Sequence, residues 1–134
     1  LTVIMPGKVK RNLQSLVVAQ AAVTALVSAF GDSMLKFRLR DLPTGYEAYL
    51  VTPLSNEEAK KETCRIEDTH PLGRLFDLDV IDADGVPMSR ESVGLSPRKC
   101  LVCDNEARYC MRNRTHTMAE LTAKIDEMIE SYVR

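Results

Sequence analysis

The stretch MLKFRLRDLPTGYEAYLVT, residues 34–52, decides the fold because it has the pattern of a β-hairpin. Hydrophobic and basic residues alternate over residues 35–40, which is the period of two that separates the faces of a strand. The basic members of this row are Lys36, Arg38 and Arg40. A turn at Pro43-Thr44-Gly45 follows, and residues 46–52 read as the returning strand. We therefore expect an antiparallel sheet in which the three basic side chains share one face.

Helical patterns lie on both sides of this hairpin. Ahead of it, apolar residues recur at steps of three, four and seven over residues 9–30, and Gly31 follows as a helix stop. Behind it, residues 56–65 are rich in Glu, Lys and Ala and follow Ser55, a good N-cap. Further on, the capping-box sequence that begins at Thr117 predicts a C-terminal helix.

Two further strands complete the predicted sheet. Residues 1–5 and 74–82 are short β-prone runs, each followed by a turn signal. The resulting order, β-α-β-β-α-β, is that of the ferredoxin-like split βαβ arrangement. We expect an α+β fold with both helices on one face of an antiparallel sheet, plus a Cys-rich segment and a C-terminal helix. Residues 1–134 form one domain in this interpretation, and because the chain opens inside a strand, we expect part of that domain to precede residue 1.

The composition narrows the classes of function. With 134 residues, 45% hydrophobic and 28% charged, the chain has room for one core. A net charge of -1 and an aromatic content of 5% do not favour a nucleic-acid partner. No fully apolar run approaches the roughly 18 residues of a membrane span, and no signal-peptide pattern opens the chain. Three of the four cysteines cluster, which fits a reducing compartment, so we expect a cytoplasmic protein without a membrane partner.

Charge is unevenly distributed along the chain. Residues 1–40 carry six basic and one acidic side chain, net +5, whereas residues 41–91 carry five basic and twelve acidic ones, net -7. Folding can turn this segregation into a site with one cationic and one anionic wall, or it can mix the charges over a solvated surface. The sequence leaves both outcomes open.

Asp77 and Asp79 are the most informative acidic pair. Two residues apart on a strand, they project from the same face, about 6.5–7 Å apart at their Cα atoms. Carboxylates this close favour a hard divalent cation between them, and Mg²⁺ so held binds substrate phosphates. The alternative is that the pair lies on an ordinary solvated sheet face.

The residues around this pair fit a phosphate-bearing substrate. His70 and Pro71 lead into Gly73, which permits close backbone approach, and Arg74, whose planar fork suits phosphate oxygens. If the sheet is ferredoxin-like, the basic row of residues 36–40 shares the open face with the two aspartates. The alternative is cross-strand salt bridging on that face, with each pair worth under ~1 kcal/mol.

A second cluster has the spacing Cys-x2-Cys-x6-Cys-x5-His. Its members are Cys100, Cys103, Cys110 and His116. These are the ligand types of a tetrahedral structural zinc site, although the spacing is not that of a common finger. The alternatives are cysteines that pack as small hydrophobic residues and a nucleophilic thiol.

Taken together, these motifs resemble one enzyme family. The run HPLGRLFDLDVID at residues 70–82, the run SPRKCLVC at residues 96–103 and the upstream TVIMPGKVK at residues 2–10 are similar to the citrate lyase holo-acyl-carrier-protein synthases, also called apo-citrate lyase phosphoribosyl-dephospho-CoA transferases. Cys110, Arg112 and His116 extend the resemblance, which covers nearly the whole chain. Members of that family usually have a further segment ahead of the position of Leu1.

The resemblance implies a nucleotidyltransferase. Its donor is 2'-(5''-triphosphoribosyl)-3'-dephospho-CoA, its acceptor is a serine of the acyl carrier (γ) subunit of citrate lyase, and diphosphate leaves. The family motif carries over onto Gly73, Arg74, Asp77, Asp79 and Arg98, together with the Cys/His set.

Roles within that motif follow from chemistry. We assign the two aspartates to Mg²⁺ and the two arginines of the motif to phosphate binding, with the basic row of residues 36–40 as secondary phosphate ligands. His70 or one of the aspartates accepts the serine proton. Acyl carriers are generally acidic, so the basic N-terminal third would also attract this partner. The rival interpretation is a non-catalytic ferredoxin-like module, regulatory or assembly-related, that is held together by zinc.

Overall fold

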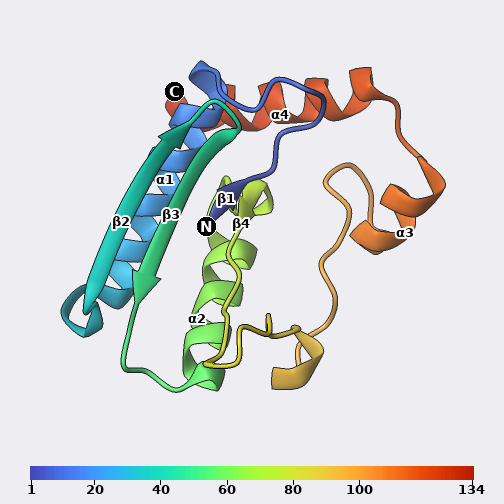
Figure 1. The fold of residues 1–134 in the computed structure, drawn as a ribbon. Helices are drawn as coiled ribbons and strands as arrows, with labels where there is room; N and C mark the ends of the chain where they lie inside the picture. The colour runs from blue at the N-terminus through green and yellow to red at the C-terminus, as the bar shows by residue number, and fades with distance from the viewer.

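A computed structural model describes residues 1–134 as a mixed α+β fold, as the sequence predicts. Figure 1 shows the main elements along the chain, and short 3-10 turns follow α1, precede β4 and lie at residues 91–93. The main elements are β1 (Thr2–Val3), α1 (Leu13–Phe30), β2 (Lys36–Leu42), β3 (Gly45–Val51), α2 (Asn56–Thr69), β4 (Phe76–Asp77), α3 (Ala107–Asn113) and α4 (Met118–Val133).

The strands form two small antiparallel sheets. The predicted hairpin is present as β2 and β3, paired in register from Lys36 opposite Val51 to Leu42 opposite Gly45. The other sheet pairs β1 with β4 over two residues each. Leu1 and Ala48 exchange hydrogen bonds of 2.9 and 3.1 Å, which brings the edge of β3 against β1. The α+β class is confirmed, whereas a continuous four-stranded ferredoxin-like sheet is not.

The prediction of a long strand over residues 74–82 is wrong. Residues 73–75 instead wind into a 3-10 turn, and the strand that follows contains only Phe76 and Asp77. Beyond it, the Leu78 N–H donates to the Glu67 carboxylate at 2.9 Å rather than to a neighbouring strand. The in-out alternation nevertheless holds, because Phe76 and Leu78 are buried while Asp79 is exposed.

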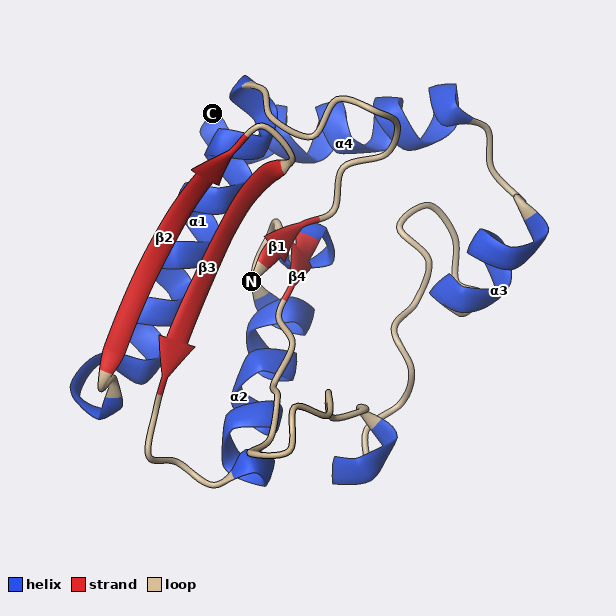
Figure 2. Ribbon diagram, viewed as in Figure 1, coloured by secondary structure: helices blue, strands red, loops and turns tan.

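Helix α1 supplies much of the core. It begins at Leu13, later than the predicted stripe, because Asn12 caps it: the Asn12 side chain accepts from the Ser15 N–H and the Ser15 hydroxyl accepts from the Asn12 N–H. Figure 2 shows α1 running alongside the β2–β3 hairpin, and most of its contacts with the hairpin are with β3. Leu35, just before β2, and Leu39 of β2 stay exposed, although Leu39 lies opposite the buried Ala48.

By length and hydropathy alone, α1 with its following turn is long and apolar enough to cross a membrane, at a mean hydropathy of 1.7 over Leu13–Ser33. The core helix of a globular protein meets the same criterion, and here the buried face of α1 packs into the cluster of apolar residues that includes Phe76 and Ile125.

The other two long helices begin where their caps predict. Ser55 accepts from the Glu58 N–H and opens α2, which continues to Thr69, four residues beyond the predicted end. Thr117 and Glu120 form the expected capping box of α4, whose Ile125 and Ile129 reach the core. Between them, Figure 1 shows residues 83–106 as a long irregular path that ends at α3, well away from the β2–β3 hairpin.

Candidate functional site

A polar cavity of about 250 Å³ lies between α2, the end of β4 and the first turn of α3. Residues 88–91 and the pair Pro97-Arg98 complete its wall. Only 4 of its 14 lining residues are hydrophobic, so the cavity suits a charged ligand rather than an apolar one.

Both aspartates of the Asp-x-Asp motif line this cavity. Asp77 is half-buried and its Oδ2 accepts from the Thr2 hydroxyl at 3.3 Å, whereas Asp79 is exposed. Neither carboxylate takes part in any of the ion pairs of the chain. The pair is therefore free to bind a cation supplied from outside the protein.

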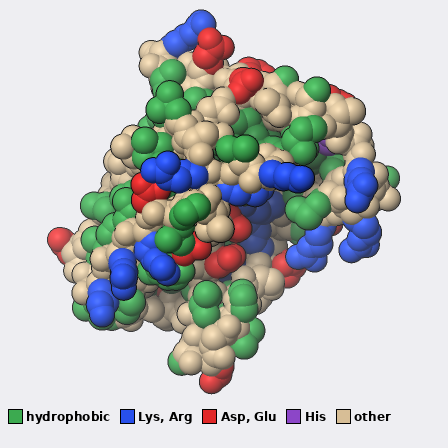
Figure 3. All heavy atoms as spheres, turned by 45° about the horizontal axis from the view of Figure 1, so that its top comes forward, with side chains coloured by type: hydrophobic (Ala, Val, Ile, Leu, Met, Phe, Trp, Pro, Cys, Tyr) green, Lys and Arg blue, Asp and Glu red, His purple; other side chains and the backbone are tan.

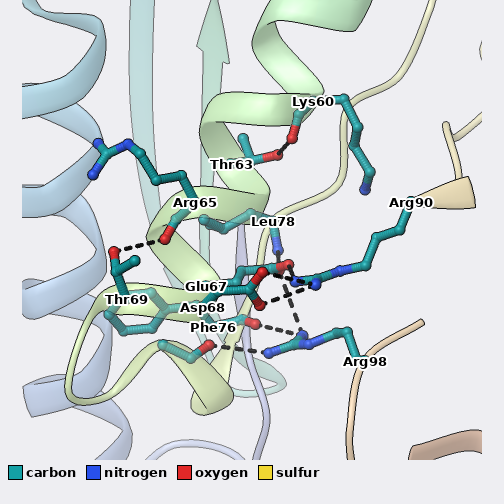
Figure 4. Close-up of polar contacts among 11 residues, drawn as sticks. Lys60, Thr63, Arg65, Glu67, Asp68, Thr69, Phe76, Leu78, Arg90 and Arg98 are labelled. Atoms are coloured by element: carbon teal, nitrogen blue, oxygen red, sulfur yellow. Dashed lines mark hydrogen bonds and ion pairs between the residues drawn. The ribbon is translucent and has the colours of Figure 1, made fainter. Parts of the chain in front are cut away.

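Glu67 of α2 lies at the centre of a group of hydrogen bonds and ion pairs behind the two aspartates (Figure 4). We call this group the Glu67 hub. The Glu67 side chain is 4% exposed, and one oxygen accepts the Leu78 N–H at 2.9 Å, between the two aspartates in sequence. The other oxygen accepts from Arg90 Nη2 at 2.7 Å, and Arg90 also binds Asp68 at 2.9 Å. Arg98 lies 3.4 Å from the first oxygen. A buried carboxylate is stabilised only by such a set of donors.

Gly73 and Arg98 hold the turn before β4 against α2. A Cβ atom on Gly73 would lie 2.2 Å from the Glu67 carbonyl oxygen, so the close backbone approach predicted at this glycine is to α2. Arg98 donates to the Phe76 carbonyl at 2.8 Å and to the Gly73 carbonyl at 3.0 Å. Arg98 reaches the cavity wall, but most of its donors are already engaged by the protein.

Two other predicted site residues lie outside the cavity lining. Arg74 is half-buried with its Nε atom unpaired, and burial together with the Arg98 charge lowers its pKa. The His70 ring lies beside Phe76 and Tyr132, with centroids 4.8 and 5.6 Å away, and its Nδ1 accepts from the Leu72 N–H at 2.9 Å. In this position His70 closes the C-terminal end of α2.

The basic row Lys36, Arg38 and Arg40 is exposed on β2 and does not line the cavity. Strand β2 pairs only with β3, so β3 and β1 separate this row from the end of β4. The predicted meeting of these three cations with the two aspartates is absent from this structure.

The structure brings the four members of the Cys/His cluster together. Their ligand atoms all lie within 4.8 Å of one another, with Cys103 Sγ 3.5 Å from Cys110 Sγ and 3.4 Å from His116 Nε2. A tetrahedral zinc ion bound at about 2.3 Å would set sulfur atoms about 3.8 Å apart. The donor set and its spacing therefore fit a metal ion, and no disulfide links the thiols.

Local hydrogen bonds also favour a thiolate in this cluster. Burial raises the pKa of the Cys100 thiol, but the N–H groups of Val102 and Cys103 and the neighbouring thiols outweigh it and lower the pKa to about 7. A hydrogen bond with Cys103 raises the pKa of His116. Cys100 is thus the thiol whose surroundings favour the thiolate that a metal requires, whereas burial and hydrogen bonds with Cys103 and Cys100 raise the pKa of Cys110.

Comparison with known proteins decides the family. The profile of the family described as "Apo-citrate lyase phosphoribosyl-dephospho-CoA transferase" matches residues 1–132. The chain belongs to this family. A Vibrio cholerae protein named "Probable apo-citrate lyase phosphoribosyl-dephospho-CoA transferase" is 43% identical over 98% of the chain and 76% of the relative. A Streptococcus pyogenes protein of the same name is 35% identical over 98% of the chain and 70% of the relative.

Membership of a family of phosphoribosyl-dephospho-CoA transferases makes the chain an enzyme of prosthetic-group attachment, and the rival interpretation as a non-catalytic module loses its support. It also confirms the resemblance drawn from the motifs of residues 70–82 and 96–103.

Sequence reasoning missed five charged residues of this polar cavity, which are Lys60, Glu67, Arg90, Glu91 and Arg108. A signal for two of them was present: Lys60 and Glu67 are seven residues apart, two helical turns, and fall on the same face of α2 as the apolar residues that are buried. Nothing local marks Arg90, which reaches Glu67 across 23 positions. Figure 3 shows acidic and basic side chains close together near the middle of one face.

Proposed function

We propose that this protein transfers the phosphoribosyl-dephospho-CoA group of 2'-(5''-triphosphoribosyl)-3'-dephospho-CoA to a serine of the acyl carrier (γ) subunit of citrate lyase. The serine oxygen forms a bond to the α-phosphorus, the bond from that phosphorus to the bridging oxygen breaks, and diphosphate leaves. The observation that carries this proposal is a polar cavity with two unpaired carboxylates in a chain of this family. Such transfers depend mainly on positioning and charge neutralisation.

In this proposal Asp77 and Asp79 hold Mg²⁺. The fit rests on their chemistry, because carboxylate oxygens are the ligands that Mg²⁺ prefers and neither carboxylate forms an ion pair within the protein. Bound Mg²⁺ would offset the negative charge of the triphosphate and of the departing diphosphate. The Glu67 hub keeps the backbone between the two aspartates fixed, so their carboxylates need little rearrangement on binding.

The serine proton goes to a carboxylate of this pair. His70 was the other predicted acceptor, but its Nδ1 already accepts from Leu72 and the ring does not line the cavity. Asp79 is the more accessible of the two carboxylates. Arg98 and Arg74 retain a role as fixed positive charge around the site rather than as free phosphate ligands.

We further propose that the Cys/His cluster binds Zn²⁺ as a structural ion. Its support is the convergence of three thiols and one imidazole within 4.8 Å in a segment that has little other packing. All four ligand positions come from the protein, which is typical of a structural rather than a catalytic zinc site.

In this proposal the acyl carrier, rather than the donor, is the partner of the exposed basic row Lys36, Arg38 and Arg40. A row of three cations on an edge strand would attract an acidic carrier from a distance, in a cytoplasmic setting. Raising the salt concentration should weaken carrier binding, and replacing the three residues by Gln should remove most of that salt dependence.

We also propose that the two sheets join into a single ferredoxin-like sheet with the strand order β2-β3-β1-β4. The support is the pair of hydrogen bonds between Leu1 and Ala48, which lie on the facing edges of β1 and β3. Slow exchange of the Ala48 amide proton in a protein that includes residue 1 would agree with this arrangement, and fast exchange would count against it.

One experiment tests the transferase proposal. The protein is incubated with apo-carrier, donor and Mg²⁺, and the carrier is weighed by mass spectrometry. We expect a gain equal to the phosphoribosyl-dephospho-CoA group together with release of diphosphate. No gain on a carrier that a known family member does modify would reject the proposal. Metal analysis of the purified protein tests zinc, with one equivalent expected.

A further inference from the structure

Lys60 is a buried lysine at the polar cavity. It lies on α2, two turns before Glu67, and only 6% of its surface is exposed. Its side chain lines the same cavity as Asp77 and Asp79. Figure 4 shows this side chain leaving α2 on the side of Arg90, and no interaction joins its ammonium group to the residues drawn.

The cavity holds four basic residues, and their charges are neutralised to different extents. Arg90 is paired with Glu67 and Asp68, and Arg98 with Glu67 and two backbone carbonyls. Arg108 is exposed, so water solvates it. Lys60 takes part in none of the ion pairs, and no hydrogen bond involves its ammonium group; besides its helix bonds, its backbone carbonyl accepts from the Thr63 hydroxyl.

Arg74 Nε is the fully buried side-chain nitrogen without a partner, so the Lys60 ammonium group keeps contact with the cavity, although the residue is only 6% exposed and no protein anion is paired with it. A lysine in this state is stabilised by a ligand that brings negative charge into the cavity. The unpaired aspartates in the same wall would repel a bare anion and attract a cation, so the ligand that satisfies both is an anion that carries a metal ion. A metal-bound polyphosphate has this chemistry.

We propose that Lys60 is a binding residue for the triphosphate of the donor, placed opposite the carboxylates that hold its Mg²⁺. This inference rests on the proposed function for the identity of the donor. The donor also contains the diphosphate of its dephospho-CoA part, which has similar chemistry. The Asp-x-Asp pair in the same cavity favours the triphosphate, where the metal is required.

Lys60→Met tests the inference, because methionine keeps much of the length of the side chain and removes the charge. Lys61→Met is the matched control, since Lys61 is the next residue of the same helix and is exposed. Binding of Mg²⁺-tripolyphosphate and of dephospho-CoA is measured by calorimetry. We expect Lys60→Met to weaken tripolyphosphate binding about tenfold or more, as for a hydrogen bond between charged groups. Dephospho-CoA binding should stay unchanged, and Lys61→Met should match the original protein for both ligands.

Two further measurements separate binding from folding. Without ligand, the melting temperature of Lys60→Met should be no lower than that of Lys61→Met, because the substitution removes an uncompensated charge. Lys60→Arg restores the charge and should recover most of the tripolyphosphate affinity. A large fall in melting temperature with unchanged affinity in the folded protein would instead assign Lys60 a structural role and overturn the inference.

The outcomes for the inference and for the proposed function differ. If the original protein modifies the carrier and Lys60→Met does so with the same rate and the same KM for the donor, the inference is wrong and the function stands. If tripolyphosphate binding depends on Lys60 but no carrier is modified, the phosphate site stands and the proposed function fails. If only dephospho-CoA binding weakens, Lys60 contacts the other phosphate group and the inference is wrong.

Discussion

Two regions of this molecule, one around Glu67 and one around Cys103, bring polar or metal-binding side chains together, and different interactions hold each of them. Around Glu67, the groups sit directly on the core: Phe76 and Leu78, which alternate with the two aspartates, are 0% and 3% exposed. Around Cys103, packing is sparse: Cys110 is buried, but its neighbours Tyr109 and Met111 are 55% and 78% exposed.

The difference indicates what each region needs in order to keep its shape. The Glu67 region is built by hydrogen bonds and ion pairs within the protein, so its geometry is present before any ligand arrives. In the cysteine region, short contacts between the ligand atoms bring residues 100–116 together, and few apolar contacts support them. We therefore expect substitutions at the first to alter the whole fold and those at the second to act locally.

The largest effect on stability should come from Glu67→Ala. This change leaves Arg90 and Arg98 without their shared buried carboxylate and the Leu78 N–H without its acceptor. Breaking a buried ion pair from one side lowers the free energy of unfolding by about 3–5 kcal/mol. Urea denaturation followed by circular dichroism measures it.

Glu62→Ala on the same helix is the control for that experiment. Glu62 pairs with Arg65 near the surface, and loss of such a pair should change the free energy of unfolding by less than about 1 kcal/mol. Equal effects of the two substitutions would show that the Glu67 hub is no more important to the fold than a surface ion pair.

The next effect is on activity rather than stability. Asp79→Asn removes one of the two charges proposed to hold Mg²⁺, so we expect carrier modification to slow on the order of a hundredfold or more. Asp79 is exposed and forms no ion pair, so the melting temperature should hardly change. Asp84→Asn, in an exposed turn outside the cavity, should leave the rate unchanged. A normal rate for Asp79→Asn would remove this residue from the mechanism.

Loss of the proposed zinc ion should have a smaller and local effect. Cys103→Ser, or treatment with a chelator, is expected to speed amide hydrogen exchange in residues 100–113 by on the order of tenfold or more, while α2 exchanges as before. Cys64→Ser is a useful contrast, because Cys64 is 1% exposed in the core and should affect the whole fold. Uniform exchange changes after chelation would mean that the two regions are not independent.

Sequence periodicity predicted the parts of the structure that depend on near neighbours. The Ser55 cap and the capping box at Thr117 involve residues three positions apart, and the hairpin follows from a local alternation and the turn that joins its strands. The strand over residues 74–82 failed because Glu67, eleven positions before Leu78, takes the N–H that a strand would use. The candidate site divides similarly: the Asp-x-Asp pair and Arg98 were predicted, whereas Lys60, Arg90 and Arg108 reach the cavity through tertiary contacts that the sequence does not mark.

The smallest expected effect is on the pH dependence of stability, to which one histidine in each region contributes. Burial lowers the pKa of His70, whereas hydrogen bonding to Cys103 raises that of His116. For His70, the unfolded chain binds a proton more readily than the folded protein, so its contribution to stability is present above the unfolded pKa of about 6.5 and is lost as the pH falls toward the folded pKa. For His116 in the metal-free protein the sign is reversed: its contribution is present below the unfolded pKa and is lost as the pH rises through the folded pKa.

Melting temperatures between pH 5 and 8 on chelated protein can separate these two contributions. His70→Asn should remove the loss of stability on the acid side, and His116→Asn should remove the loss on the neutral side, each changing the slope by less than one proton. The Leu72 N–H supports this assignment for His70, because it donates to Nδ1 and so requires that nitrogen to be unprotonated. If His70→Asn leaves the fall in melting temperature at acid pH unchanged, protonation of His70 is not its cause. The carboxylates around Glu67 then become the groups to test.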